Sequence, residues 1–383
     1  MEYALSELFT LQMGKTPSRD NSSYWKKSEN NWISIADLTN SGKYISNTKE
    51  TLSDSAVVES GIKKIPANTV IMSFKLSLGK VAITEKEMFS NEAIMAFIDK
   101  GVEKISPEYL YYLLRAKDWS KGTNKAVMGA TLNKATLSTI KIQLHEYDNQ
   151  LEIVNMLNRV SSSIDFRKQQ LTKLDELIKA RFVEMFGNFV YELDRWSTCE
   201  IGDVADTIDP QPSHRTPPVS LDGIPYIGIA ECNYQTRKIA FKSARKVGKD
   251  VLKEHKNRYT LNDGDFIIGK IGTIGKPFFL PTDCDYTLSA NTVLIKPQKD
   301  KINPRFLFAI FESEYMDRII DAEKKSTSQP AFGIQKVRSI EIPLPPLSLQ
   351  NQFAAFVEEV DKSKLLTELF AQSTCILAEN RSK

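Results

Sequence analysis

The chain has 383 residues, of which 41% are hydrophobic and 26% are charged, and its 51 basic and 48 acidic side chains leave a formal net charge of +3. This length is too great for one ordinary domain, and the composition is typical of a globular protein rather than a disordered or fibrous one. A charge so close to balance excludes a uniformly basic protein, so any surface that binds nucleic acid must be a local patch.

The amino-terminal residues and the cysteines bear on where the chain functions. Residues 1–10 mix acidic and apolar side chains, so they predict no signal peptide. No apolar run approaches the roughly 20 residues of a membrane-spanning helix. The four cysteines are far apart and form no Cys-x-x-Cys pair, which argues against a disulfide framework and a zinc site. We therefore expect a protein of a reducing cytoplasm with no membrane partner.

The first 144 residues predict an α+β unit. Short runs rich in β-branched and aromatic residues, separated by turn residues, predict strands. A helix is expected over residues 107–117, because Pro107 stands near its start and apolar residues recur on one face. The predicted strands cover residues 32–35, 69–74, 81–83 and 94–98.

Residues 189–344 repeat this order of segments. Residues 226–231 resemble residues 32–37, and similar matches continue along both units. Asn91 and Asn291 each follow a glycine–lysine turn, so we align them as equivalent positions. A repeat of this length is too long for a solenoid unit and indicates duplication of a whole α+β domain.

A long helix is predicted between the two units, over residues 145–186. No proline or glycine interrupts this segment, and Gly187 is a natural stop. Apolar residues follow the alternating four–three spacing of a heptad seam. A helix of about 40 residues would be about 60 Å long, and its seam needs a partner. The apolar seam residues are Ile153, Leu157, Val160, Ile164, Leu171, Leu174 and Ile178.

A second helical pattern begins near Ser348, after several prolines, and Ser363 and Thr367 interrupt its apolar stripe. Each long helix could pack on its own domain. Alternatively the two helices could pair in antiparallel orientation, as a pseudo-twofold relation between the halves would require. We favour the paired arrangement. The apolar positions of the second helix include Phe353, Phe356, Val360, Leu366, Phe370 and Leu377.

No segment of the sequence carries a convincing catalytic or metal site. His145, His214 and His255 have no metal-ligand spacing to another His or Cys, and no Gly-x-Ser-x-Gly motif is present. Residues 269–276 lack the Gly-x4-Gly-Lys-Ser/Thr pattern of a phosphate-binding loop. Residues 303–306 differ by one residue from the Asn-Pro-Pro-Phe tetrapeptide of amino-methyltransferases, but they fit a helix start better. We expect a non-catalytic chain.

Basic and amide side chains recur at equivalent points of the repeat. Lys and Arg neutralise phosphates, Asn and Gln can pair with adenine, and Arg or Lys can pair with guanine. Asn91 and Asn291 could instead close turns, so both interpretations stay open. The candidate nucleic-acid contacts of the first unit are Lys15, Thr16, Ser18, Arg19, Lys75, Lys80, Asn91 and Lys125. Those of the second unit are Gln211, Ser213, Arg215, Lys246, Lys270, Lys276, Asn291, Ser328 and Gln329.

Several segments together resemble the specificity subunit of type I restriction–modification systems, and the resemblance covers essentially the whole chain. Residues 14–18, followed by Trp25 and Trp32, resemble the opening of a target recognition domain in that family. Residues 175–187 resemble the end of the family's central helix. Residues 340–353 resemble the passage from a recognition domain into a conserved helix.

The first such passage departs from the family pattern, because Gln143, His145 and Glu146 stand where prolines are usual, although Gln150 remains. The resemblance implies an α+β fold with two similar target recognition domains. It also implies two long helices that pair as an antiparallel coiled coil, with pseudo-twofold symmetry. The implied segments are residues 1–144 (first recognition domain), 145–188 (central helix), 189–344 (second recognition domain) and 345–383 (carboxy-terminal helix).

The resemblance also implies function and partners. Each recognition domain would bind one half of a split target in double-stranded DNA, and the helices would fix the length of the unread spacer. Two modification subunits would bind S-adenosylmethionine and methylate adenine, and restriction subunits would use ATP and Mg. The chain itself would hold no cofactor and would act at the nucleoid in a prokaryotic cytoplasm.

Two other functions compete with this expectation. The chain could be the recognition portion of a fused restriction–methylation enzyme, which would require catalytic motifs that the sequence lacks. It could also be a coiled-coil scaffold without a nucleic-acid function, which would explain the helices but not the repeated polar loops. Binding that depends on salt concentration and on DNA sequence would separate these possibilities.

Overall fold

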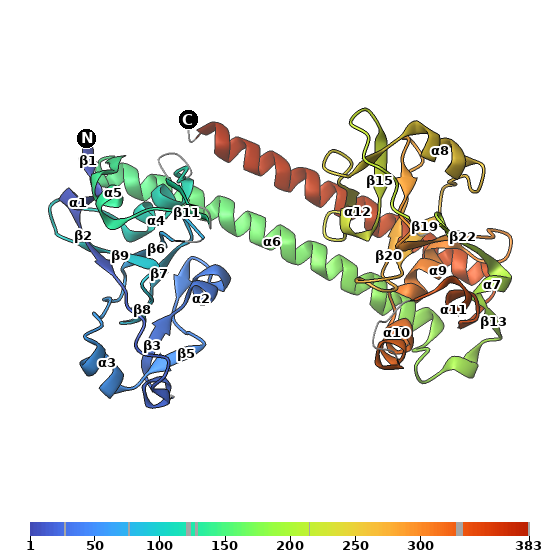
Figure 1. Ribbon diagram of the computed structural model, residues 1–383, viewed down its shortest axis with the longest axis horizontal. Coiled ribbons are helices and arrows are strands. Elements are labelled where there is room, and N and C mark those ends of the chain that lie inside the picture. Colours follow the sequence, from blue (N-terminus) through green and yellow to red (C-terminus); the bar gives the residue numbers. More distant parts are fainter. Residues whose placement is uncertain are drawn as a thin grey trace. The chain divides into compact units, whose positions relative to one another are not determined.

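The structure is a computed structural model that describes residues 1–26, 28–75, 77–119, 124–126, 129–213, 215–326 and 332–381. It does not describe the side chains of residues 124–126, 129–131, 325–326 and 368–381. The chain divides into two compact units, residues 1–163 with 378–383 and residues 164–377. Both units combine sheets and helices (Figure 1).

The first unit contains a five-stranded and a three-stranded sheet. The larger has the strand order β2-β9-β6-β7-β4 and the smaller has the order β5-β3-β8. Neighbouring strands are antiparallel except in the pairs β4–β7 and β3–β8. The strands are β2 (Phe9–Met13), β3 (Asn30–Ile33), β4 (Tyr44–Ile45), β5 (Glu50–Leu52), β6 (Val70–Ser73), β7 (Val81–Thr84), β8 (Phe89–Ser90) and β9 (Ile94–Asp99).

Alternation of side chains along β6 explains why both faces of the larger sheet are covered. Val70 and Met72 belong to the core that includes Leu110 of α4 (Pro107–Ala116). Ile71 belongs to a separate core with Ile33, because successive side chains of a strand point to opposite faces. Helix α4 confirms the helix expected at this place. The other short helices of the unit are α1 (Leu5–Leu8), η1 (Ser22–Trp25), α2 (Ile35–Asn40), α3 (Asp54–Ser60) and α5 (Lys134–Thr139).

The second unit repeats the sheet orders of the first. Its sheets have the orders β14-β22-β19-β20 and β18-β15-β21, and β15 is parallel to β21 as β3 is to β8. The repeated strands are β14 (Ala205–Ile208), β15 (Ile224–Ile227), β18 (Lys246–Val247), β19 (Phe266–Gly269), β20 (Pro277–Phe279), β21 (Thr287–Leu288) and β22 (Thr292–Pro297). The repeated helices are α7 (Ile201–Val204), α8 (Lys249–Lys256), α9 (Pro304–Phe311) and α11 (Ile334–Arg338).

The described parts of the two units also differ. The hairpin of β16 (Cys232–Asn233) and β17 (Lys238–Ile239) forms its own two-stranded sheet, whereas β4 joins the larger sheet of the first unit. Helix α10 (Glu314–Ser326) follows α9, and the first unit instead has a hairpin of β10 (Asn124–Ala126) and β11 (Gly129–Thr131) before α5. The short helices η2 (Leu193–Arg195) and η3 (Ile229–Glu231) complete the unit.

A short two-stranded sheet leads each unit into a long helix. In the first unit β1 (Glu2–Ala4) pairs with β12 (Lys141–Gln143) before α6 (Tyr147–Phe186). In the second, β13 (Thr198–Glu200) pairs with β23 (Glu341–Pro343) before α12 (Leu347–Arg381). The two helices have 40 and 35 residues, so the expected long helices are confirmed.

A buried glutamine fastens the start of each long helix to its domain. The Gln150 Oε1 accepts from the backbone N–H of Ser106 at 3.0 Å, at the start of α4. The Gln350 Oε1 accepts from Asn303 at 2.8 Å, at the start of α9. Both glutamines have no exposed surface, so each amide replaces the water that a buried N–H would otherwise need.

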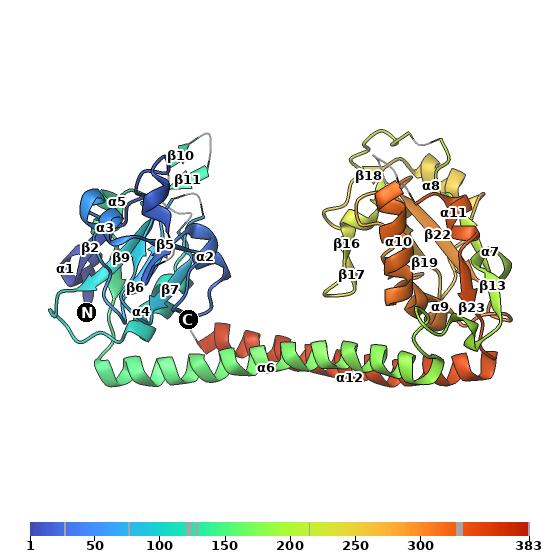
Figure 2. The ribbon, with the colours of Figure 1, turned by 90° about the horizontal axis from the view of Figure 1, so that it is seen from below.

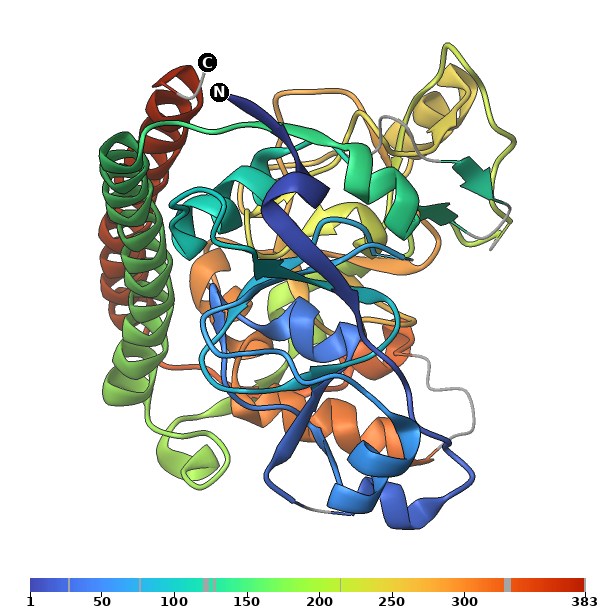
Figure 3. The ribbon, with the colours of Figure 1, turned by 90° about the vertical axis from the view of Figure 1, so that its left-hand side faces the viewer.

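The later part of α6 pairs with α12 in antiparallel orientation within the second unit. The rings of Phe182 and Phe353 lie 5.5 Å apart, and the Lys364 Nζ lies 2.6 Å from Asp175 Oδ1. Residue numbers fall along α6 as they rise along α12, which defines the antiparallel direction. Figures 2 and 3 show this part of α6, coloured light green, beside the red α12. The paired arrangement is therefore confirmed for residues 164–186; the pseudo-twofold relation stays a prediction.

The apolar stripe predicted for α6 stays a prediction, whereas the stripe predicted for α12 needs a correction. All seven apolar seam residues of α6 are half-buried. On α12, Phe353 and Val360 are buried, and Phe356 lies 5.7 Å below the Arg181 guanidinium. Leu366 is 58% exposed, because the inward face passes through Lys364 and Thr367 instead. Phe370 and Leu377 lie outside the described side chains.

Candidate nucleic-acid interface

The candidate contacts of the first unit begin in the loop after β2, which lies close against the turn before β9. Backbone N–H groups of Gly14 and Lys15 donate to Ile94 O at 3.2 Å and Ser90 O at 2.8 Å. A Cβ on Gly14 would lie 2.1 Å from Ser90 O and 2.3 Å from Asn91 O. Only glycine therefore permits this approach, and the loop that carries Lys15, Thr16, Ser18 and Arg19 is held at a fixed place.

An aromatic residue supports this loop in both units. In the first, the Trp32 Nε1–H donates to Lys15 O at 3.0 Å. In the second, the Tyr226 hydroxyl donates to Gln211 Oε1 at 2.6 Å and accepts from Ala290 N at 3.1 Å. The two aromatic residues occupy matching places, since β3 and β15 pair in the same way with β8 and β21. The two units therefore share the backbone arrangement around this loop, while the aromatic side chains that support it differ.

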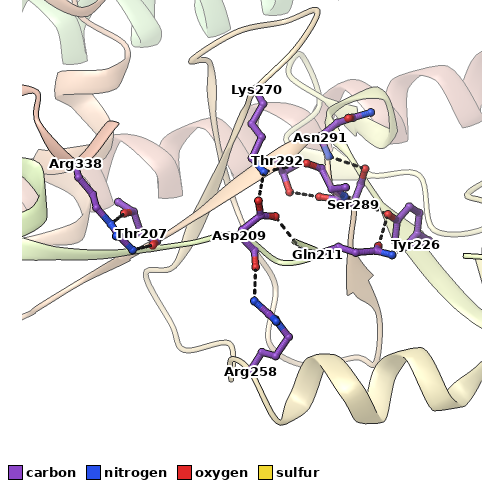
Figure 4. Close-up of polar contacts among 11 residues, drawn as sticks. Thr207, Asp209, Gln211, Tyr226, Arg258, Lys270, Ser289, Asn291, Thr292 and Arg338 are labelled. Atoms are coloured by element: carbon purple, nitrogen blue, oxygen red, sulfur yellow. Dashed lines mark hydrogen bonds and ion pairs between the residues drawn. The ribbon is translucent and has the colours of Figure 1, made fainter. Parts of the chain in front are cut away.

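The second unit holds its loop with an internal ion pair (Figure 4). The Lys270 Nζ lies 2.7 Å from Asp209 Oδ2 and donates to Ala290 O at 3.1 Å. Asp209 also accepts from Gln211 N at 3.1 Å and, through its backbone carbonyl, from Arg258 at 3.3 Å. Lys270 is one of the predicted nucleic-acid contacts, but its ammonium is buried and paired with Asp209 inside the unit. Lys270 positions the loop after β14.

Apolar residues occupy the matching places in the first unit. Phe74 N donates to Ala93 O at 2.9 Å, as Lys270 N donates to Asn291 O at 2.9 Å. Met13 is the last residue of β2, and Asp209 directly follows β14. Comparison of the strand pairing places Met13 opposite Met95 and Asp209 next to the Ile208–Leu294 pair. Phe74 and Met13 therefore stand where the second unit has Lys270 and Asp209.

The hydrogen bonds also correct the alignment of the two asparagines. Asn91 N donates to Ile33 O at 3.1 Å, whereas Ser289 N donates to Ile227 O at 2.7 Å in the second unit. Asn91 therefore corresponds to Ser289, and the predicted equivalence of Asn91 with Asn291 is wrong by two positions. The two asparagines align in sequence because both lie shortly before similar apolar strands, but Asn91 is three residues before the start of β9 and Asn291 directly precedes β22.

The two turns are closed by different side chains. The Asn91 Oδ1 accepts from Ala93 N at 3.0 Å, and the Ser289 Oγ accepts from Asn291 N at 3.2 Å. The turn-closing interpretation thus holds for Asn91. The side chain of Asn291 is exposed, and its amide has no hydrogen bond among the described residues, so this amide is accessible to a ligand.

The other candidate contacts fall into three groups. The exposed candidates are Lys15, Ser18, Lys80, Ser213, Arg215, Lys246 and Lys276. Thr16 and Lys75 are half-buried: the Thr16 hydroxyl donates to Glu92, and the Lys75 Nζ lies 5.3 Å from the centre of the Phe74 ring. Lys125, Ser328 and Gln329 lie outside the described side chains.

Arg19 makes the most ordered contacts of the loop after β2. Its guanidinium donates to both carboxylate oxygens of Glu50, at 2.6 Å and 3.0 Å, and its Cζ lies 3.6 Å from the centre of the Trp25 ring. This hydrogen bond raises the pKa of Arg19 and lowers the pKa of Glu50. Both groups therefore stay charged at neutral pH. Glu50 could not be identified from the sequence, because no spacing rule connects it to Arg19.

A buried histidine supports the basic helix α8. His255 is 2% exposed, and its Nδ1 is hydrogen-bonded to the Thr287 hydroxyl and lies 3.3 Å from the Tyr259 hydroxyl. Burial lowers the pKa of His255, since the charged form is poorly solvated there. The ring joins α8 to β21 as a neutral group. On the same helix, Lys253 and Lys256 are exposed.

The described part of the chain contains no group of three or more His, Cys, Asp or Glu placed to hold a metal ion. Among the same residues, no helix has both the length and the apolar character needed to cross a membrane. What the site offers is therefore a set of ordered amide, guanidinium and ammonium groups on loops.

Comparison with known proteins agrees with this architecture. A family model for the type I restriction modification DNA specificity domain matches residues 1–176 and 194–371. The type I restriction enzyme MjaIX specificity subunit of Methanocaldococcus jannaschii is 24% identical over 368 residues, which span 90% of this chain and 83% of the relative. The HindI specificity subunit of Haemophilus influenzae is 29% identical over 189 residues, or 47% of this chain and 40% of the relative.

Solved structures show the same fold. One, from work on complex assembly and conformational transition of the type I R–M system, has a TM-score of 0.59 and 16% identity, covering 99% of this chain and 95% of the other. The type I S subunit from M. genitalium has a TM-score of 0.54 and 12% identity, covering 99% and 94%. With both domain matches, the chain belongs to the type I restriction–modification DNA specificity family.

Proposed function

We propose that this chain is the sequence-specificity subunit of a type I restriction–modification complex and that each unit recognises one half of a bipartite DNA target. The observation that carries the proposal is that the two units share one fold but present different side chains in the corresponding loops. Lys15 and Gln211 occupy matching places, as do Trp32 and Tyr226. Two copies of one fold that present different polar groups would bind two different half-sites.

The charge distribution supports binding to a duplex. Exposed basic residues gather on and beside α8 of the second unit, where they would neutralise phosphates. Phosphate contacts position a protein on DNA, while contacts to base edges give specificity. The affinity of the isolated chain for DNA should therefore be modest, and it should fall as the salt concentration rises. The basic residues are Arg245, Lys246, Lys249, Lys253, Lys256 and Arg258.

The long helices would set the spacer and hold the partners. Apolar side chains on α6 and α12 remain exposed beside the paired seam, among them Phe166 (57%), Leu177 (47%) and Leu365 (57%). Contact with another protein would remove these apolar side chains from water. We assign this surface to two modification subunits, with restriction subunits joining the same complex.

Catalysis and cofactors would belong to these partners. S-adenosylmethionine would be bound by the modification subunits, and ATP and Mg by the restriction subunits, while this chain would remain non-catalytic. The complex would act on DNA at the nucleoid of a prokaryotic cytoplasm. The loops described above are polar and exposed, which suits contact with DNA rather than enclosure of a small cofactor.

Sequencing of DNA methylated by the assembled complex tests the proposal. The chain would be co-expressed with its modification subunits, and methylated adenines would be mapped across a genome. We expect one motif with two specific half-sites and an unread spacer of constant length. A single contiguous motif, or methylation without sequence preference, would overturn the proposal.

A further inference from the structure

We propose that Arg19 recognises a guanine in one half-site, and that Glu50 and Trp25 are positioning residues for its guanidinium. This inference rests on the proposed function, and it specifies which base Arg19 recognises and how its neighbours orient it. It is carried by the way Arg19 is held in the first unit: Glu50 and Trp25 contact its guanidinium directly, and further contacts hold Trp25 in place.

The first two contacts act on the guanidinium directly. Its terminal nitrogens lie 2.6 Å and 3.0 Å from the two carboxylate oxygens of Glu50, which makes a two-point fork. The Trp25 ring lies beneath the Cζ at 3.6 Å. A fork sets the direction of the group and a stacked ring sets its plane, so Arg19 loses little additional freedom on binding a base.

The third contact fixes the stacking ring itself. The Trp25 Nε1–H donates to Ser18 O at 3.0 Å, and the ring meets Trp32 edge-on, with centroids 4.9 Å apart and an interplanar angle of 82°. Trp32 is 2% exposed and is anchored through Lys15 O. The support therefore extends from the guanidinium into the core of the unit.

The fork leaves donors of Arg19 available. A guanidinium has five N–H groups, and a two-point fork to one carboxylate uses one on each terminal nitrogen. The N–H of Nε and the remaining N–H on the adjacent terminal nitrogen are parallel. Neither has an acceptor among the residues that the structure describes, and the side chain is 49% exposed. Arg19 thus retains a second pair of donors for a ligand.

Guanine is the base that matches this pair. Its O6 and N7 are two adjacent acceptors on the major-groove edge, and a guanidinium binds both at once. Adenine places a donor beside its N7, so it would oppose one of the two N–H groups. Lysine lacks the rigid pair of donors, so it would keep the charge but lose the geometry.

The surface beside Arg19, Glu50 and Trp25 has room and polar groups for the edge of a DNA base pair. Trp25 and Glu50, the two partners of Arg19, line a hollow of about 710 Å³, although Arg19 itself is not among its lining residues. Exposed Lys49 and Lys86 lie on the same hollow and would contact phosphates. The remaining lining side chains are short and polar or acidic: Ser28, Glu29, Asn31, Asn47, Thr48 and Thr51.

The second unit supplies a matched control. Arg215 follows Gln211 with the spacing by which Arg19 follows Lys15. Its side chain is exposed and has no ion pair within the described part of the chain. An unsupported arginine at this place should not show the sensitivity to a neighbouring carboxylate that Arg19 shows.

Motif sequencing with the full methylation complex tests the inference. Arg19→Lys keeps the charge, so complex assembly and general DNA affinity should be retained. Preference for guanine at one position of one half-site should fall on the order of 10- to 100-fold. Glu50→Gln leaves Arg19 intact and should weaken the same position to a smaller extent, while Arg215→Lys should leave that position unchanged.

The outcomes are separable from those of the proposed function. If the wild-type complex gives no bipartite motif, the proposed function fails. If the wild-type motif is bipartite but Arg19→Lys and Glu50→Gln both preserve it, the Arg19 inference alone is overturned. If Arg19→Lys does not assemble, Glu50→Gln decides: loss of the guanine preference supports the inference and an unchanged motif refutes it.

Discussion

Side chains at matching positions show how the same fold can hold a charged pair in one unit and apolar residues in the other. Lys270 and Asp209 form an ion pair below the loop after β14, and Phe74 and Met13 occupy the matching places in the first unit. The side chains of Lys270 and Asp209 are only 10% and 17% exposed. A buried charge pair is more sensitive to loss of one partner than an apolar pair is, because the remaining charge keeps its desolvation cost.

We predict that Lys270→Met destabilises the second unit by about 3–5 kcal/mol, since it leaves the Asp209 carboxylate buried without a cation. Denaturant unfolding, with hydrogen exchange at β14 and β19, measures this loss. Lys276→Met is the matched control, because Lys276 is exposed. The double variant Asp209→Met/Lys270→Phe copies the first unit and should recover most of the loss. Wild-type stability for Lys270→Met would refute the assignment.

At this scale the sequence predicted residue types better than their roles. Asn91 was recognisable as a turn residue, but only the hydrogen-bond register shows that Ser289, not Asn291, is its counterpart. Lys270 is predicted as a nucleic-acid contact, because nothing in its local sequence reveals its partner Asp209, which lies far away in the chain. The support of Arg19 by Glu50 was hidden for the same reason.

Elements were more predictable where their signal was local and periodic. The uninterrupted heptad spacing predicted α6, which spans Tyr147–Phe186, and Pro107 predicted the start of α4. Helix α10 was not predicted from the sequence, because no glycine or proline separates its segment from that of α9. The seam of α12 was misplaced at Leu366, because Lys364 replaces an apolar seam residue and pairs with Asp175.

The junction of α6 and α12 depends on an aromatic cluster. Phe353 has no exposed surface, and its ring lies 5.5 Å from Phe182 and 5.6 Å from Phe186. We predict that Phe353→Ala costs about 3–5 kcal/mol, the usual result of emptying a large buried site. Denaturant unfolding measures the cost.

Leu365→Ala provides the control on the same helix, because Leu365 is 57% exposed. Its stability should stay within about 0.5 kcal/mol of the wild type. Equal effects of Phe353→Ala and Leu365→Ala would mean that the cluster does not hold α12, and the pairing of the helices would need another explanation.

For the molecule as a whole, duplication is the property from which function follows. The two units repeat the strand orders of their sheets, and in each a buried glutamine joins the long helix to its domain. They also share the loop after the first strand of the larger sheet, but the side chains at matching positions of this loop differ. The repeat and the resemblance to the family were visible in the sequence. The choice of bases was not, because it depends on loop side chains such as Arg19 whose contacts are long-range.

The most direct test of two independent recognition units is the methylation motif of a chain in which residues 189–344 are replaced by a second copy of residues 1–144. Sequencing of DNA methylated by its complex should give two identical half-sites in inverted orientation, both equal to one half of the wild-type target. Retention of the original asymmetric motif would contradict the account, since the replaced unit would then not determine a half-site.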